Sequence, residues 1–353
     1  MRATLVISLL VLVACSESFP PASAVNEFRV VAAKVEVEAD RARANPSPEE
    51  QVEVSVLSID RGVPEDPDVS ALSPAPLQWR FVPCVPAPVT IGPPICLDAI
   101  EPCTGCAATP PDDPLATPVV GFEVPTAQEL EDADARSVLL QGVVCANGTP
   151  SEDAIRRYLL GETEDLTPCE GPAQIDGRAI EGRFVTIQIP IEADPGDPNL
   201  NPELSGLLLD GRGWPPPYDA GVPRDAAGTG CAADLDGLSV AEREAHPRAG
   251  DDPSTINLSV TRESIQTFTV DDTELTEEIQ VSWLADGGGF EVSFSFISEP
   301  ARSVLTSWKP PKSVPEDGQL VRLNFVVRDG RGGSDWTERG LCILPPAQAP
   351  SPP

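Results

Sequence analysis

The chain has 353 residues, a length that suits two domains, each able to bury its own core. Its 56 acidic and 24 basic residues give a formal net charge of −32, so the surface repels polyanions and nucleic-acid binding is excluded. The single histidine, His246, allows no two-histidine metal site and is interpreted as a surface residue. The G-x-S-x-G and H-E-x-x-H motifs are absent, which excludes the hydrolases that depend on them.

The first residues have the pattern of a cleaved export signal. One basic residue, Arg2, precedes an apolar run that starts at Leu5 and is too short to span a bilayer. Leu12-Val13-Ala14-Cys15 closes this run and resembles the lipobox of bacterial lipoproteins. The resemblance implies a signal peptide at 1–14 and a lipid anchor on Cys15.

The chain beyond Cys15 is therefore expected outside the cytoplasm. Residues 15–26 are predicted to be a tether, and Ser16 implies, again by resemblance, an outer-membrane destination with the chain facing the periplasm or the cell surface. The alternative is an ordinary secretory signal cut at Ala22-Ser23-Ala24, which would leave a soluble protein.

Eight further cysteines predict disulfides, because their number is even and the chain is exported. Cys231 and Cys342 lie after the predicted linker and are expected to pair with each other. The pairing of the other six is open: Cys84, Cys96, Cys103, Cys106, Cys145 and Cys169. Cys103 and Cys106 form a C-x-x-C motif, but no βαβ pattern surrounds it, so a structural disulfide is favoured over a redox or zinc site.

The first domain is predicted at 27–193. Alternation of apolar and polar residues predicts strands near 35–37, 52–56, 77–81, 138–144 and 185–191. A Cys- and Pro-rich insertion at about 85–125 interrupts them. Thr126 begins a capping box for one short helix, and Ser151 begins a second helix that ends at Gly161.

A polar connector at 194–202 precedes the second domain, predicted at 203–344. Alternation predicts strands at 204–209, 256–260, 279–283, 290–296 and 321–327, with a long insertion at about 210–253. The acidic stretches 129–134 and 271–278 are interpreted as solvent-exposed. Trp308-Lys309-Pro310-Pro311, and Trp214 with Tyr218, could form a ligand surface or simply hold loops in place. The Pro-rich tail 345–353 is expected to be disordered.

The predicted fold is all-β, with two antiparallel immunoglobulin-like sandwiches carrying disulfide-stapled loops and short helices. Trp79 lies 25 residues after Val54, and Trp283 lies 25 residues after Leu258, each on the third strand of its domain. With the run from Leu323 to Gly333, this pattern resembles bacterial immunoglobulin-like, PKD-like and cadherin-like modules.

Four connector residues resemble the calcium linkers of cadherins: Asp194, Asp197, Asn199 and Asn201. The resemblance implies calcium as the one candidate cofactor. A connector without metal is the favoured interpretation.

We therefore expect a non-enzymatic, lipid-anchored envelope protein that binds a protein or glycan, with the two long insertions as the places of contact. Its membrane contact would be the lipid anchor. One alternative is an envelope enzyme that acts on polysaccharide with a pair of carboxylates. Another is a passive scaffold component of an envelope assembly.

Overall fold

The computed structural model describes residues 22–59, 77–88, 94–108, 117–172, 174–175, 178–192, 196–214, 231, 235, 239, 246–270 and 272–346. The predicted signal peptide, Cys15 and the end of the tail lie outside these residues. Among the described helices, none combines the length and apolar character needed to cross a membrane.

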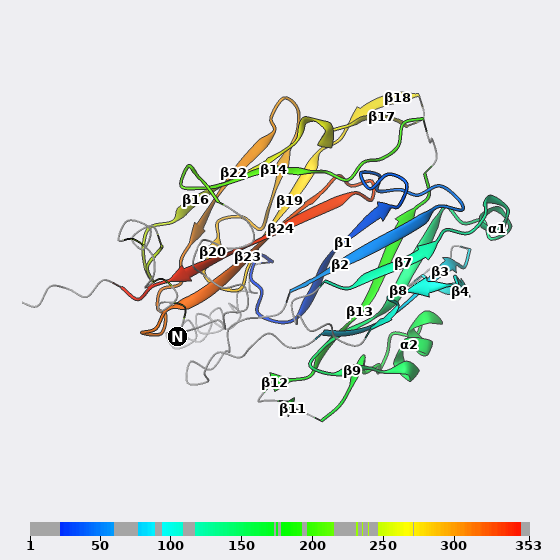
Figure 1. The fold of residues 1–353 in the computed structure, drawn as a ribbon, viewed down its shortest axis with the longest axis horizontal. Coiled ribbons are helices and arrows are strands. Elements are labelled where there is room, and N and C mark those ends of the chain that lie inside the picture. Colours follow the sequence, from blue (N-terminus) through cyan, green and yellow to red (C-terminus); the bar gives the residue numbers. More distant parts are fainter. Residues whose placement is uncertain are drawn as a thin grey trace, which may run out of the picture.

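The first half of the chain forms two antiparallel sheets (Figure 1). One sheet contains β1 (Arg29–Val37), β2 (Gln51–Ile59), β7 (Val119–Glu123) and β5 (Cys103–Thr104), in this order. The other contains β13 (Glu181–Pro190), β8 (Ser137–Ala146), β3 (Leu77–Pro86) and β4 (Cys96–Ala99), with β6 (Ala107–Ala108) also paired with β3. Alternate residues of β2 are buried because successive side chains of a strand point to opposite faces.

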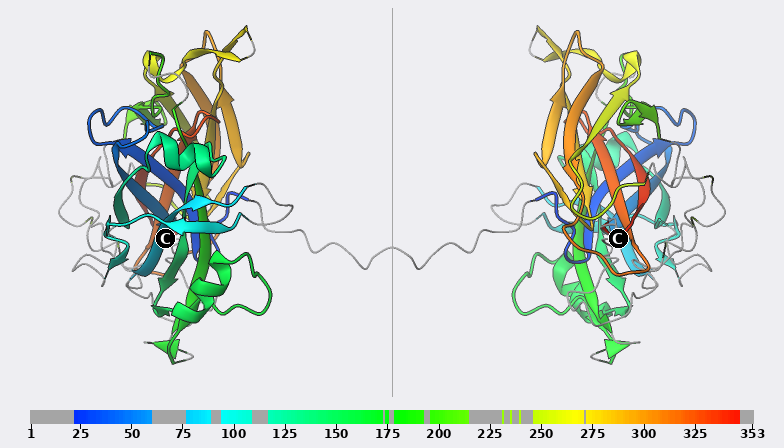
Figure 2. Two further views of the ribbon diagram at one scale, coloured as in Figure 1. Left: turned by 90° about the vertical axis from the view of Figure 1, so that its right-hand side faces the viewer. Right: turned by 90° about the vertical axis from the view of Figure 1, so that its left-hand side faces the viewer.

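Two short helices and two short ribbons decorate this first sandwich. Helix α1 (Ala127–Asp132) begins at Thr126 with the predicted capping box to Glu129, and α2 (Glu152–Leu159) begins at Ser151. The ribbons pair β9 (Thr149–Pro150) with β10 (Cys169–Glu170), and β11 (Gln174–Ile175) with β12 (Arg178–Ala179). Both α-helices lie at the end of the first sandwich that points away from the second half (Figures 1 and 2).

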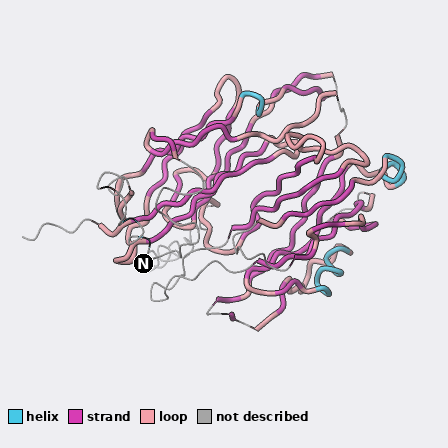
Figure 3. Tube along the Cα trace, viewed as in Figure 1, coloured by secondary structure: helices cyan, strands magenta, loops and turns pink. Residues whose placement is uncertain are grey.

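The second half also forms two antiparallel sheets. One contains β15 (Arg212–Gly213), β14 (Leu204–Leu209), β16 (Ser254–Val260), β22 (Ser303–Lys309) and β20 (Gly289–Phe290), in this order. The other contains β21 (Phe294–Ile297), β19 (Ile279–Ala285), β23 (Gln319–Arg328) and β24 (Ser334–Ile343). A short 3-10 helix (Arg262–Ser264) and a hairpin of β17 (Thr267–Val270) and β18 (Thr273–Thr276) complete it. Figure 3 shows that strands make up most of the regular structure.

The two sandwiches share one strand order. The order β1-β2-β7 opposite β13-β8-β3 in the first corresponds to β14-β16-β22 opposite β24-β23-β19 in the second. This is the arrangement of the immunoglobulin fold. Trp79 on β3 and Trp283 on β19 occupy equivalent third strands, and each is buried in the core of its sandwich. The predicted fold class, two immunoglobulin-like sandwiches, is confirmed.

Several details of the second sandwich differ from the sequence prediction. The expected single strand through Phe290 and Phe296 is wrong, because the chain changes sheets between β20 and β21. Strand β22 was not predicted, and Trp308 within it is fully buried, with its indole N–H donating to Gly287 O at 3.1 Å. Of the two interpretations considered for Trp308, a ligand surface and a residue that holds a loop in place, neither describes it, because its ring fills the core.

Four disulfides join the eight cysteines: Cys84–Cys96, Cys103–Cys106, Cys145–Cys169 and Cys231–Cys342. The last is the pair that the sequence favours, and it ties the second insertion to β24. The two cysteines of the C-x-x-C motif, Cys103 and Cys106, are bonded to each other. Each sandwich is thus crosslinked separately, and no disulfide among the described residues joins the two.

Noncovalent contacts hold the sandwiches together. Ala32, Leu57 and Ile59 of the first sandwich form one apolar cluster with Leu284 and Val326 of the second. The described part of the predicted tether belongs to the same joint. Val25 N–H donates to Ala285 O at 2.8 Å, and Ala285 N–H donates to Ser23 O at 3.0 Å. The joint between the sandwiches is therefore a packed interface.

Candidate functional site

The outer edge of β1 is closed by side chains from the second half of the chain. Alternate residues of an edge strand direct their carbonyl groups away from the sheet. Three donors reach these carbonyls: Arg328 Nη2 binds Val31 O, Ser334 Oγ binds Ala33 O, and Asn201 Nδ2 binds Val35 O. Lys34 Nζ also pairs with Asp335 Oδ1 at 3.3 Å. These bonds fix β1 against the turn between β23 and β24.

That turn is built around a buried carboxylate. Asp329 accepts hydrogen bonds from the backbone N–H groups of Arg331, Gly332 and Gly333. Its burial raises the pKa of the carboxyl group. Gly333 is needed because a Cβ at this position would lie 2.3 Å from Asp329 Oδ2. The turn between β23 and β24 is therefore a rigid part of the interface between the two sandwiches.

A second buried acid supports the same turn. Glu277 is 3% exposed, pairs with Arg331 Nη1 at 2.8 Å and accepts the N–H of Gln266 at 3.0 Å. Its pKa is raised, with desolvation as the largest cause. The prediction that all acids of 271–278 are solvent-exposed is wrong at Glu277, because Arg331 lies close enough to compensate its charge.

The connector residues predicted as calcium ligands have different surroundings. Asp194 lies outside the described residues, Asp197 is exposed and Asn199 is fully buried. The side-chain oxygen of Asn201 accepts the N–H of Ser334 at 3.0 Å, while its nitrogen binds β1. Within the described residues, no group of three or more His, Cys, Asp or Glu could hold a metal ion. Calcium binding stays a hypothesis.

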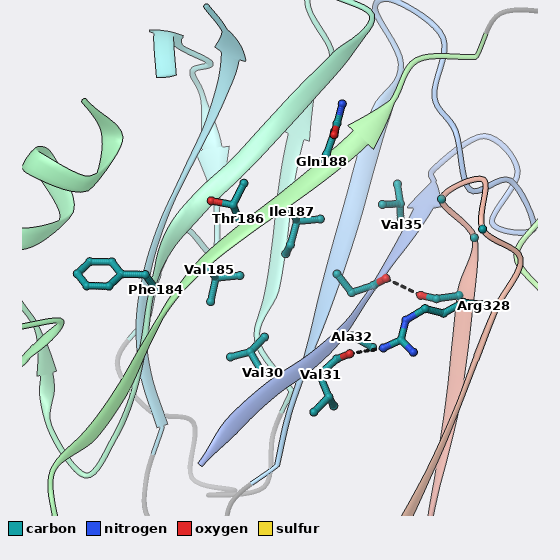
Figure 4. A pocket seen from close by; sticks show the side chains of 15 residues that line it. Val30, Val31, Ala32, Val35, Phe184, Val185, Thr186, Ile187, Gln188 and Arg328 are labelled. Carbon is teal, nitrogen blue, oxygen red and sulfur yellow. Dashed lines mark hydrogen bonds between the residues drawn. The ribbon is translucent and has the colours of Figure 1, made fainter. Parts of the chain in front are cut away.

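A groove of about 480 Å³ lies between β1, β13 and the turn after β23 (Figure 4). Residues 30–33 and 184–188 form its two long walls, and Arg328 and Gly332 stand at the third side. Before β1 begins, Phe28 N–H donates to Glu181 Oε2 of β13 at 2.7 Å. At the other end, Gly332 approaches Pro190, since a Cβ on Gly332 would lie 3.2 Å from Pro190 Cδ.

The wall formed by β13 is a free sheet edge. Phe81 N–H on β3 donates to Cys106 O, on the side away from β8. Opposite Phe81, Gly142 of β8 therefore turns its backbone groups toward Val185 of β13. By alternation, the N–H and C=O groups of Phe184, Thr186 and Gln188 point away from β8. Pro190 continues this alternation, and its missing N–H suits an unpaired edge.

Arg328 is the charged group of the groove. Its Nη1 donates to Ser282 Oγ at 3.0 Å and its Nη2 donates to Val31 O across the groove (Figure 4). No carboxylate of the described residues lies within ion-pair distance of this guanidinium. Desolvation by burial lowers the pKa of Arg328, and none of these carboxylates is close enough to offset that effect. The groove thus contains a half-buried cation that has no counter-ion among the described residues.

The carboxylates near α1 have structural partners. A second pocket, of about 550 Å³, is lined by Asp98, Glu101, Glu123, Glu129 and Asp132. Glu123 accepts Gln51 Nε2 at 2.7 Å, and Asp132 accepts Gln128 Nε2 at 2.8 Å. Hydrogen bonds from Thr126 lower the pKa of Glu129. Glu123, Glu129 and Asp132 are thus hydrogen-bonded to other residues at this end of the first sandwich.

His246 is 6% exposed, so the prediction of a surface position is wrong. The residues after it pack along the end of β24, where Leu344 N–H donates to Pro247 O at 3.0 Å. His246 directly precedes Pro247, so this contact places it in the protein interior.

Comparisons with known proteins add little to this geometry. No protein-family model matches the chain, and no curated protein matches it. Among solved structures, the two tandem V-type regions of VCBP3, a v-region-containing chitin binding protein, align over 89% of this chain and 100% of that chain. Sequence identity is 8% and the TM-score is 0.23, values too low to support any inference about this chain.

Sequence reasoning missed the groove and Arg328. The signal for Arg328 was present, because it ends an alternating strand directly before Asp329-Gly330. The sequence could not show that Arg328 has no carboxylate partner among the described residues, since 56 acids offer many candidate ion pairs. β1 and β13 lie at opposite ends of the first domain in the sequence, so no local sequence pattern indicates that they are neighbours in the fold.

Proposed function

We propose that this protein is a lipid-anchored binding protein of the cell envelope, without enzymatic activity, that takes up a protein or glycan partner in the groove between β1 and β13. The second of the two insertions expected to meet the partner lies in large part outside the described residues, and the described part of the first supplies β4, β5, β6 and β7 to the sheets, so the proposal is built on the groove. An outer-membrane anchor at Cys15 rests on the lipobox resemblance alone.

The observation that carries the proposal is a groove with fixed walls and unused polar groups. Its walls come from both sandwiches, and side-chain bonds from Arg328, Ser334 and Asn201 hold them in place. A preformed concave surface with a few convergent polar groups is typical of a binding site. A rigid frame also lowers the entropic cost of binding.

Site-specific photo-crosslinking in cells tests this proposal. A photoreactive residue replaces Gln188, which lines the groove and is exposed, and the control carries it at Glu274, which is exposed on β18. The expected result is a discrete crosslinked species, protein or glycan, from position 188 only. Equal yields at the two positions, or no species at 188, would refute a partner in the groove.

The anchor is tested separately by metabolic labelling with an alkyne fatty acid. The wild-type chain should be labelled and fractionate with membranes, and Cys15→Ser should lose both properties. Label on the Cys15→Ser chain would contradict the lipobox assignment. The enzyme alternative predicts new reducing ends when the purified chain is incubated with envelope polysaccharide, and we expect none.

A further inference from the structure

We propose that the groove binds an extended peptide segment that carries one carboxylate. The peptide backbone would add to the free edge of β13, and the carboxylate would pair with Arg328. This inference rests on the proposed function, because it names the partner class of the same groove.

The edge of β13 offers the pattern that an extended backbone recognises. Phe184, Thr186 and Gln188 each present one N–H and one C=O toward the groove, spaced two residues apart. Strand addition uses such a row of main-chain groups for affinity, and side-chain pockets for selectivity. Between Phe184 and Gln188 the edge is roughly 14 Å long at 3.4 Å per residue. The contacts at Glu181 and Pro190 lie about 31 Å apart along the strand, so the added strand is shorter than about nine residues.

The second sandwich shows extended chain at the corresponding strand. The residue after β24, Leu344, pairs in parallel with Arg248. Leu344 N–H donates to Pro247 O at 3.0 Å, and Ala249 N–H donates to Leu344 O at 2.8 Å. In the first sandwich, β13 is the strand equivalent to β24, and no described segment pairs with its outer edge. The fold thus accepts an extended segment beside the end of this strand, and within the described residues no segment is paired with the outer edge of β13.

The charge of the groove sets the chemistry of the occupant. Arg328 has no carboxylate partner among the described residues, although the chain carries 56 acids and only 24 basic residues. A guanidinium–carboxylate pair forms strong, charge-assisted hydrogen bonds. A run of acids would be repelled by the net charge of −32, whereas one carboxylate at Arg328 would be attracted locally. The geometry therefore points to an otherwise uncharged peptide with a single carboxylate.

Fluorescence anisotropy with the full chain in detergent micelles tests the inference. The probe is a synthetic mixture of fluorescein-labelled peptides about seven residues long, with valine, threonine and serine in varied order and a free terminal carboxylate. The comparison mixture has the same peptides as terminal amides. The carboxylate mixture should bind at least about tenfold more tightly than the amide mixture, the gain of one charge-assisted contact.

Matched variants locate the contacts. Arg328→Gln should weaken binding of the carboxylate mixture about tenfold, to the level of the amides, while Arg262→Gln, which removes an exposed arginine elsewhere, should leave it unchanged. Ser334→Ala removes a neighbouring bond of the joint without changing charge, so any loss of affinity should be equal for the two mixtures and leave the preference for the carboxylate unchanged. Gln188→Pro removes one edge N–H and should abolish binding, whereas Gln188→Ala keeps that N–H and should bind normally. Melting curves check that each variant is folded.

Three outcomes would overturn the inference: no binding of the carboxylate peptides to the folded wild type, equal binding of the two mixtures, or equal losses of the carboxylate preference in Arg328→Gln and Ser334→Ala. A species crosslinked at position 188 together with any of these outcomes would leave the binding function standing and remove only the peptide assignment. Absence of any crosslinked species at 188 would instead remove the proposed function itself.

Discussion

Removal of the Cys231–Cys342 disulfide should destabilise the second sandwich more than removal of any other disulfide destabilises the first. The two cysteines are 111 positions apart, and both are fully buried. For a closed loop of this length, the chain-entropy relation gives about 4.8 kcal/mol at 25 °C. The same relation gives about 3.5 kcal/mol for Cys145–Cys169, with a separation of 24, and about 1.6 kcal/mol for Cys103–Cys106, with a separation of 3.

The assay is equilibrium unfolding in urea of three double Cys→Ala variants, monitored by far-UV circular dichroism and by tryptophan fluorescence. Alanine keeps the buried positions apolar and small, so the differences report the lost crosslink. The expected order of destabilisation is the order of loop length. Equal losses in the three variants, or the largest loss for Cys103–Cys106, would show that local strain or packing, and not loop closure, determines the contribution of these disulfides.

Three further measurements test the structure. Trp308→Ala should cost about 3–5 kcal/mol of unfolding free energy in a urea titration, because the side chain is fully buried. Burial raises the pKa of Asp286 from 3.8 to about 6 despite the nearby Arg322, so its contribution to stability is complete below pH 4 and is lost as the pH rises to 6. The stability of wild type relative to Asp286→Asn should therefore fall by on the order of 3 kcal/mol between pH 4 and pH 7, measured by urea titration at each pH. Chelation of calcium should leave X-ray scattering and melting unchanged, because the Asn201 side-chain oxygen is already bound by Ser334 N–H; a chelator-dependent shift would support the calcium hypothesis.

The strands that sequence predicts well are those with one buried face. β2 and β16 alternate between buried and more exposed residues, and the two helix caps at Thr126 and Ser151 are local signals that need no tertiary information. Strand β7 was not predicted because it lies in a stretch dominated by cysteine and proline. Strand β22 was not predicted because the polar residues serine, threonine and lysine surround Trp308 in the sequence.

The candidate site was less accessible to sequence than the fold. It depends on two edge strands from opposite ends of the first domain, and on a turn of the second domain. Glu277 and His246 show the same limit, since each is polar and is buried only because of distant partners. Composition can predict how much charge a surface carries, but it cannot identify the one described arginine of the groove that lacks a carboxylate.

The hydrogen bonds of Ser23 and Val25 with Ala285 attach part of the predicted tether to the second sandwich before the chain enters the first. If Cys15 carries lipid, residues 16–22 are the linker between the bilayer and the folded chain, and seven residues span at most about 25 Å. The anchor would then join the protein where the two sandwiches meet, because Val25 packs with Ile59 of the first sandwich and Leu284 of the second. A pull on the lipid would load β19 through the hydrogen bonds of Ala285, and β1 through the chain that continues from Val25 to Arg29.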